Sequence, residues 1–260
     1  MLEIEDIYLH TADDIGISAS FVIPAAPGPH PGLIICHGMP MAKEKKRNVT
    51  SSLEKDELDY DSLAEWCALE GFATLIFNFR GTGDSGGNFH PLGWAQDLLC
   101  ALDWVKGRQE VDNERVILMG SSFGAVIAIY VASQRPDVAG IVSFASPART
   151  DTQHSSEELV NRLRDIGIIR DKDFPQSYDD FLSEYKIINP NQLIHRISPR
   201  PILLVHGYED DVVPVENAYT LYERALEPKD IQILQKVGHR FRSEPDAIDL
   251  CISWLRSNFM

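Results

Sequence analysis

Several features that mark other classes of protein are scarce in this sequence. Only four cysteines occur among 260 residues, and no two of them form a Cys-x-x-Cys pair. We therefore expect a cytoplasmic protein with reduced thiols rather than a fold held by disulfides. The histidines and cysteines also lack the spacing of metal ligands, so no metal site is expected.

Long apolar runs and an excess of basic residues are missing as well. No apolar run approaches membrane-spanning length, and the first residues do not form a signal peptide. The net charge is −15, from 39 acidic and 24 basic side chains. Nucleic acids and anionic membranes require clustered Lys and Arg, so neither is expected as a partner. The oligomeric state is left open, with a homodimer as one alternative.

The apolar residues that are present form short runs separated by helical patterns. An alternating pair at 4–10 and 17–23 predicts two antiparallel strands. Fully apolar runs predict further strands at 33–36, 73–77, 116–119, 140–144, 201–205 and 231–234. Helices are expected at 58–69, 93–106, 123–133, 216–225 and 246–256. Together these predict one α/β domain over residues 1–260, with a mostly parallel eight-stranded sheet covered by helices on both faces.

One segment, 148–198, is too long for a single crossover helix. It is polar and carries two weak helical patterns, at 157–166 and 178–187. We interpret it as a small helical cap inserted in the domain, over the mouth of a site. The alternative is a longer surface crossover with no role in the site.

The motif Gly120-Ser121-Ser122-Phe123-Gly124 lies between a predicted buried strand and an apolar helix. A serine at the apex of such a turn projects its hydroxyl into a cleft, and small residues two positions away let the turn close tightly. This is the pattern of a nucleophile elbow. It makes Ser122 a candidate for covalent catalysis, provided that a base reaches it.

In the hydrolases whose nucleophile lies in an elbow of this kind, the acid and then the histidine follow the serine along the chain. Four histidines lie beyond Ser122, at positions 154, 195, 206 and 239. An acidic run after a predicted strand, within 205–214, offers the acid. Only His239 follows that run, in a loop between the last strand and the last helix.

With these motifs in order, the sequence resembles the α/β-hydrolase superfamily, among small serine esterases and the dienelactone-hydrolase-like or prolyl-oligopeptidase-like hydrolases. The resemblance implies a triad of Ser122, Asp210 and His239, with Asp211 as second choice for the acid. It also implies an oxyanion hole formed by the backbone N–H groups of Met39 and Phe123.

A glycine pattern at 81–86 matches the dinucleotide-binding fingerprint G-x-G-x-x-G. The residues that follow it delay the next helix, so no helix N-terminus would face a pyrophosphate. In the resembled superfamily this stretch is a structural loop, which Arg80 and Asp84 would suit. No cofactor is therefore expected.

The leading functional hypothesis is a serine hydrolase that cleaves carboxylic esters of small or medium acyl substrates. Its partner would be a small-molecule ester. A serine peptidase or amidase of the aminopeptidase kind is the alternative. A non-catalytic, ligand-binding member of the fold is a third, less favoured one.

Overall fold

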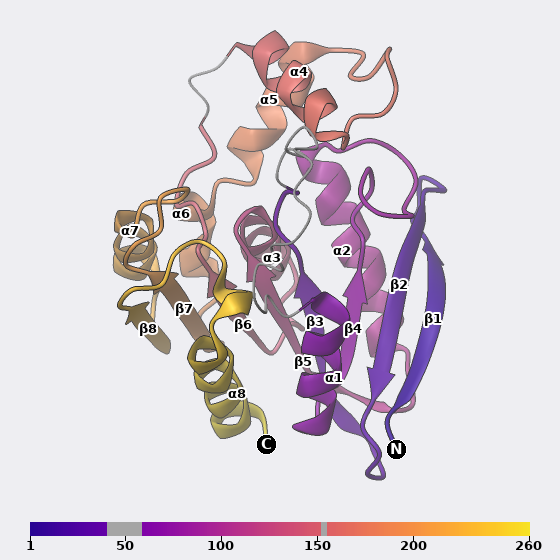
Figure 1. Ribbon diagram of the computed structural model, residues 1–260, viewed down its shortest axis with the longest axis vertical. Coiled ribbons are helices and arrows are strands. Elements are labelled where there is room, and N and C mark those ends of the chain that lie inside the picture. Colours follow the sequence, from indigo (N-terminus) through magenta and orange to yellow (C-terminus); the bar gives the residue numbers. More distant parts are fainter. Residues whose placement is uncertain (41–58, 152–154) are drawn as a thin grey trace, which may run out of the picture.

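The computed structural model describes residues 1–40, 59–151 and 155–260, and these ranges contain one eight-stranded sheet (Figure 1). The strand order is β1-β2-β4-β3-β5-β6-β7-β8. The pairs β1–β2 and β2–β4 are antiparallel. Every later pair in this order, from β4–β3 to β7–β8, is parallel. The strands are β1 (Glu3–His10), β2 (Gly16–Ile23), β3 (His30–Cys36), β4 (Ala73–Phe77), β5 (Val111–Ser121), β6 (Gly140–Phe144), β7 (Ile202–Gly207) and β8 (Lys229–Leu234). The predicted α/β-hydrolase fold is confirmed.

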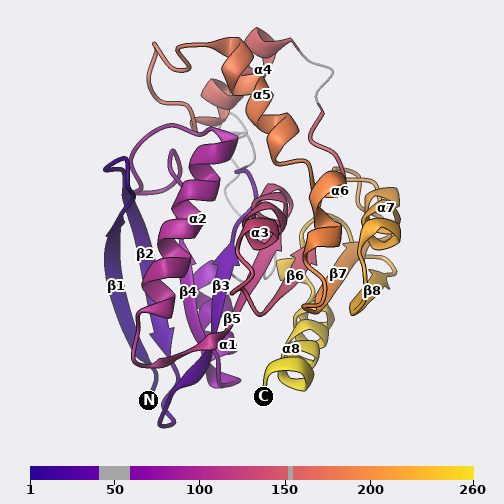
Figure 2. The same cartoon turned by 180° about the vertical axis from the view of Figure 1, so that it is seen from behind.

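Helices cover both faces of this sheet (Figures 1 and 2). On one face, α1 and α8 enclose a core with Leu33, Met119 and Val205. On the other face, α2, α3, α6 and α7 enclose a larger core. The helices are α1 (Tyr60–Leu69), α2 (Pro91–Lys106), α3 (Phe123–Gln134), α4 (Ser156–Ile166), α5 (Tyr178–Ile187), α6 (Pro190–Leu193), α7 (Glu216–Arg224) and α8 (Pro245–Phe259), with short 3-10 turns at η1 (Ile194–Arg196) and η2 (Phe241–Ser243).

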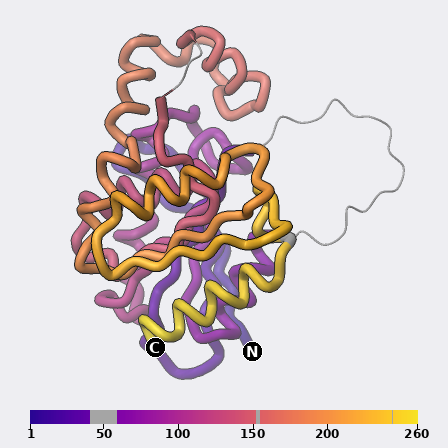
Figure 3. The backbone as a smooth tube through the Cα atoms, turned by 90° about the vertical axis from the view of Figure 1, so that its left-hand side faces the viewer, coloured from indigo at the N-terminus to yellow at the C-terminus, as the bar shows by residue number. Residues whose placement is uncertain are grey.

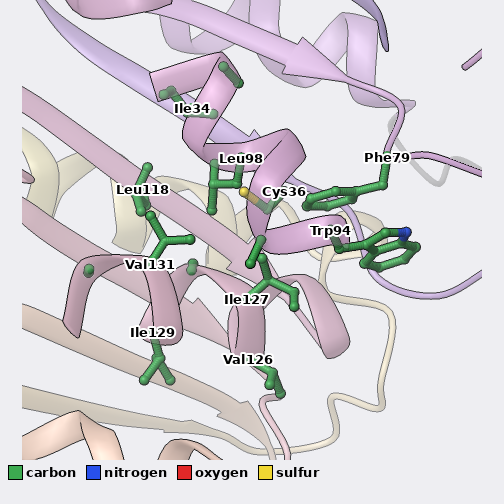
Figure 4. Packing of buried hydrophobic residues seen from close by; sticks show 14 of the residues in the cluster. Ile34, Cys36, Phe79, Trp94, Leu98, Leu118, Val126, Ile127, Ile129 and Val131 are labelled. Carbon is green, nitrogen blue, oxygen red and sulfur yellow. The ribbon is translucent and has the colours of Figure 1, made fainter. Parts of the chain in front are cut away.

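The helix that follows the elbow motif, α3, is buried on nearly every side. Val126, Ile127 and Ile129 are all completely inaccessible to solvent. Ile127 points toward Cys36 of β3 and Leu98 of α2, whereas Val126 and Ile129 project from the opposite side of α3 (Figure 4), and all three belong to the larger core. A helix that is apolar around its whole circumference must lie inside the protein. Its first residue is therefore held in a fixed position relative to the sheet.

The helices α4 and α5 lie together at the end of the molecule toward which the parallel strands run (Figures 1 and 2). The chain termini lie at the opposite end (Figure 3). α4 begins with a capping box. The side chain of Ser155 accepts a hydrogen bond from the backbone N–H of Glu158, and the side chain of Glu158 accepts one from the backbone N–H of Ser155. Phe181 and Tyr185 of α5 are buried and join the core beside α3.

The structure differs from the sequence expectations mainly at element ends. β5 begins at Val111, five residues earlier than predicted, because Val111 pairs with His30 across a register shift in β3. α1 begins at Tyr60, where Asp59 caps the helix by accepting a hydrogen bond from Ser62, and the expected start at residue 58 lies outside the described residues. α6 was not predicted. No helix of the described ranges is long and apolar enough to cross a membrane.

Candidate active site

Ser122 lies in a sharp turn between β5 and α3. Its backbone has φ 53° and ψ −123°, a left-handed conformation that is strained for any residue with a side chain. The turn is held in place because the Ser122 N–H donates to the carbonyl of Phe144 in the neighbouring strand β6, at 2.8 Å. The Ser122 carbonyl in turn accepts from Ala125 at 3.0 Å, which starts α3.

The two glycines that flank this turn are required by close backbone contacts. A Cβ atom at Gly120 would lie 2.5 Å from the Cα of Ala125. A Cβ atom at Gly124 would collide with the carbonyl oxygens of Cys36 and His37 at the end of β3. Any side chain at either position would push α3 away from the sheet. The small residues of the motif therefore serve the packing of the turn.

Asp210 follows β7 and is buried, with no exposed side-chain surface. Its Oδ1 accepts hydrogen bonds from the backbone N–H groups of Val212 and Val213, at 2.9 and 2.8 Å. Its Oδ2 lies 2.8 Å from Nδ1 of His239. Asp211, the second choice for the acid, is exposed. The carboxylate in contact with His239 is thus that of Asp210.

A second histidine, His206, lies behind the same carboxylate. Its Nε2 donates to the carbonyl of Val213 at 2.7 Å and lies 3.3 Å from Asp210 Oδ2. Burial lowers the pKa of His206 below its ordinary value. A neutral His206 fixes the loop after β7, so its contacts give it a structural role.

Ser122 and His239 line the same cavity, which has a volume of about 420 Å³. The wall also includes His37, Gly38 and Met39, which follow β3. The loops after β3, β5 and β8 thus meet at the carboxyl edge of the sheet, as expected for a site in an α/β fold. The cavity brings together residues that are more than 80 positions apart along the chain.

The two residues whose backbone N–H groups are expected to form an oxyanion hole belong to different elements: Met39 follows β3, and Phe123 begins α3. Met39 contributes to the cavity wall. A Cβ atom at the preceding residue, Gly38, would lie only 3.0 Å from the Cβ of Ser122. Phe123 is the first residue of α3, so its N–H has no carbonyl partner within that helix. Its ring packs against Trp94 and Tyr185.

His37 supports this part of the wall. Its Nδ1 donates to the carbonyl of Gly38 at 2.7 Å, and its Nε2 accepts from the N–H of Phe79 at 3.2 Å. Burial is the main reason that the pKa of His37 is lowered to about 4. A neutral ring is required for these two bonds together. His37 therefore ties the end of β3 to the loop after β4.

The loop at 81–86 is fixed by a buried ion pair that sequence reasoning missed. Arg80 is 2% exposed, and its Nε and backbone N–H each donate to the carboxylate of Asp97 at 2.8 Å. Its Nη1 also lies 2.8 Å from Asp13. Arg80 was expected to suit a structural loop, and its described ionic partners come from α2 and from the turn after β1. The sequence feature that could have indicated this pair is Asp97, an acidic residue on the apolar face of the helix predicted at 93–106.

The predicted cap segment packs beside the elbow but does not contribute to the described cavity wall. Glu184 of α5 accepts from the N–H of Leu92 at 2.9 Å and lies 2.9 Å from Nδ1 of His90. These bonds join α5 to the start of α2. Among the described residues that line the cavity, none belongs to 148–198. A role for this segment as a cap stays a prediction.

Comparisons with known proteins agree with this architecture. The sequence model of the prolyl oligopeptidase family matches residues 58–259. The uncharacterized protein Rv2307c of Mycobacterium tuberculosis is 25% identical over 94% of this chain and 74% of its own length. The human mitochondrial palmitoyl-protein thioesterase ABHD10 is 28% identical over 71% of this chain and 63% of its own length.

Similarity at the level of structure extends over the whole chain. The α/β hydrolase GrgF from Penicillium sp. sh18 superimposes with a TM-score of 0.77 and 18% identity, covering 99% of both chains. At this identity the likeness concerns the fold. The family match covers more than three quarters of the sequence, including all the residues discussed from Tyr60 onward. This chain, an α/β hydrolase by fold, belongs to the prolyl oligopeptidase family.

Proposed function

We propose that this protein is a serine hydrolase that cleaves carboxylic esters of small or medium acyl groups through an acyl-enzyme intermediate. One observation carries the proposal. The imidazole of His239, held at 2.8 Å by the buried Asp210, lies in the wall of the cavity that also contains the strained Ser122. A base that is oriented by a carboxylate and shares a cavity with an elbow serine has the parts that acyl transfer requires.

In the proposed reaction, Ser122 Oγ attacks the ester carbonyl carbon and its proton passes to Nε2 of His239. The Nδ1–H of His239 donates to Asp210, which stabilises the imidazolium ion. His239 then protonates the leaving alcohol, and the acyl group stays on Ser122. A water molecule, deprotonated by His239, attacks the acyl-enzyme and releases the acid.

The negative charge that develops on the carbonyl oxygen needs donors in fixed positions. The N–H groups of Met39 and Phe123 are the proposed pair. Gly38 supports this assignment because its small size lets the chain before Met39 approach Ser122 closely. Loss of one such donor in comparable enzymes raises the barrier by about 3–4 kcal/mol.

The family name makes a peptidase the natural second candidate. An aminopeptidase needs an anion to hold the α-ammonium group of its substrate. The described part of the cavity wall contains no aspartate or glutamate. This supports esters over aminoacyl amides. The human relative is named a thioesterase, and a thioester would pass through the same acyl-enzyme, with a thiol as leaving group.

Turnover of 4-nitrophenyl acetate and butyrate, compared with aminoacyl 4-nitroanilides, tests the proposal. We expect the esters to have the higher kcat/KM. Faster cleavage of the anilides would favour the peptidase. No cleavage of either series, together with no reaction with a fluorophosphonate probe, would favour a non-catalytic binding protein.

A further inference from the structure

A second cavity, of about 360 Å³, adjoins the catalytic cavity that Ser122 lines. The two cavities share three lining residues, His37, Tyr60 and Asn78. A substrate whose ester group lies at Ser122 therefore has room to extend past these residues. The chemistry of the second cavity then bears on which esters the protein accepts.

The wall of the second cavity is polar. Alternate residues of β2 belong to the larger core, and Ser18 and Ser20, which lie between them, face the second cavity instead. Asp6 and Asp61 also line it, and both are exposed, so water screens their charge. A wall of hydroxyl and carboxylate groups favours a hydrogen-bonding group over an alkyl chain, which would bury these polar groups without partners.

Asn78 lies directly after β4 and has a fixed backbone. Its N–H donates to the carbonyl of Ser18 at 2.9 Å, and its carbonyl accepts from the hydroxyl of Ser85 at 2.5 Å. The loop that carries Ser85 is held in turn by Arg170, whose guanidinium group donates to the carbonyls of Gly83 and Ser85 at 2.9 and 2.7 Å. The fold therefore defines the place of Asn78 between the two cavities.

The side chain of Asn78 lies against Gly83, which lines the catalytic cavity. A Cβ atom at Gly83 would be 2.5 Å from Cγ and Nδ2 of Asn78, so the glycine leaves the space that the carboxamide occupies. Among the described residues, no protein group forms a hydrogen bond with this half-buried carboxamide. Its two N–H donors and its carbonyl oxygen are left for water or for a ligand.

We propose that the carboxamide of Asn78 binds a hydroxyl group of the substrate, so that the enzyme selects esters that carry a hydroxyl on one of their two chains. This inference deepens the proposed function and rests on it. A carboxamide both donates to a hydroxyl oxygen and accepts from its hydrogen. An alkyl chain in the same place would displace water from the carboxamide and leave it without a partner, which costs binding free energy.

Two series of matched esters test the proposal. ω-Hydroxyalkyl butyrates carry the hydroxyl on the alcohol side, and ethyl ω-hydroxyalkanoates carry it on the acyl side. Each is paired with the ester in which a methyl group replaces the hydroxyl, and acid release at constant pH gives the ratio of the two kcat/KM values. We expect the wild type to prefer the hydroxy ester in one series, which identifies the chain that reaches Asn78.

Asn78→Leu keeps the approximate volume of the side chain but not its polar atoms. It should reduce the preference for the hydroxy ester about three- to tenfold, mainly through KM. If this variant does not fold, Asn78→Ala replaces it, because the backbone bonds of Asn78 do not involve its side chain. Asn113→Leu is the matched control, since Asn113 is exposed on β5 and lines neither cavity.

The control should leave the ratio unchanged. A wild-type ratio near one in both series would overturn the proposal. Equal losses on both esters of a pair in Asn78→Leu would overturn it too, because they would mean that Asn78 acts on the reaction or the fold and not on the hydroxyl group.

A binding measurement separates this inference from the proposed function. The preferred hydroxy ester and its methyl counterpart are titrated into Ser122→Ala protein, with and without Asn78→Leu, and binding is followed by NMR of the ligand. Tighter binding of the hydroxy ester that is lost in Asn78→Leu supports the inference even if the wild type hydrolyses no ester. Ester hydrolysis by the wild type without any such preference sinks the inference and leaves the proposed function standing.

Discussion

Nδ1 of His239 lies 2.8 Å from Oδ2 of Asp210, across 29 positions of sequence. The contact depends on the loop after β7 approaching the loop after β8, where the N–H of Glu209 donates to the carbonyl of Val237 at 3.0 Å. The carboxylate is satisfied by two further backbone donors, so it has one oxygen left to orient the imidazole. This is the arrangement by which a buried acid selects one tautomer of a histidine.

Asp210→Asn should lower kcat for ester hydrolysis by about four orders of magnitude. An amide at this position would turn an N–H toward His239 or stabilise the wrong tautomer. The control is Asp211→Asn, which alters an exposed neighbour and should stay within about twofold of the wild type. Steady-state kinetics with 4-nitrophenyl butyrate measures both. Similar losses in the two variants would contradict the assignment of the acid.

Gly124→Ala should destabilise the protein by about 1–3 kcal/mol, because the new methyl group collides with the carbonyl oxygens at the end of β3. Urea unfolding gives the free energy. Gly107→Ala is the control, since a Cβ there would lie at ordinary contact distance, 3.4 Å from the Trp104 carbonyl. If both variants unfold at the same urea concentration as the wild type, the tight turn at Ser122 is not needed for packing.

Asp97→Ala should cost more than about 1 kcal/mol of unfolding free energy, because it removes the fully buried carboxylate that pairs with Arg80 and leaves this guanidinium group, whose side chain is 3% exposed, with Asp13 as its remaining carboxylate partner. The exposed pair of Arg135 and Asp137 provides the comparison. Asp137→Ala should cost less than about 1 kcal/mol. Thermal or urea unfolding of the two variants measures the difference, and a small effect at Asp97 would show that the ion pair contributes little.

Stability should also depend on pH through His37. Its pKa is about 4 in the folded protein, below the ordinary value of 6.5, because burial opposes the charged form. The unfolded chain therefore binds a proton first as the pH falls, and stability is lost between about pH 6.5 and 4. From pH 7 to 5 this linkage amounts to about 2 kcal/mol.

The variant His37→Gln keeps an acceptor and a donor but does not titrate. Urea unfolding of both proteins at pH 7 and pH 5 isolates the effect of this residue from that of the many carboxylates. We expect the wild type to lose about 2 kcal/mol more than His37→Gln over this interval. An equal change in the two proteins would mean that His37 titrates as an ordinary exposed histidine.

Much of the fold could be predicted from the sequence because buried parallel strands are continuous apolar runs. The expected strand at 140–144 and the expected helix at 178–187 match β6 and α5 residue for residue. Strand starts were predicted less well. Val111 belongs to β5 through its pairing with β3, and the polar residues 112–115 that follow it gave no local signal of a strand.

The candidate site could be predicted in part. Ser122 could be predicted from the glycine-flanked elbow motif, and His239 because it is the histidine that follows the acidic run after β7. Asp210 was preferred to Asp211 only through the resemblance to the superfamily, because the directions of two adjacent carboxylates are set by the backbone of the loop, which the residues alone do not reveal. The pairing of Arg80 with Asp97, and of Arg242 with Tyr60, joins residues far apart in sequence. Such contacts depend on how α1 and α2 pack, which periodicity does not specify.

The central claim, that Ser122 is the nucleophile, is tested most directly by a fluorophosphonate probe followed by peptide mass spectrometry. We expect one probe per chain, attached to Ser122, with ester hydrolysis lost in parallel with labelling. Ser122→Ala should neither react nor hydrolyse esters while its circular dichroism spectrum is unchanged. Labelling of another residue, or hydrolysis that persists in Ser122→Ala, would contradict the claim.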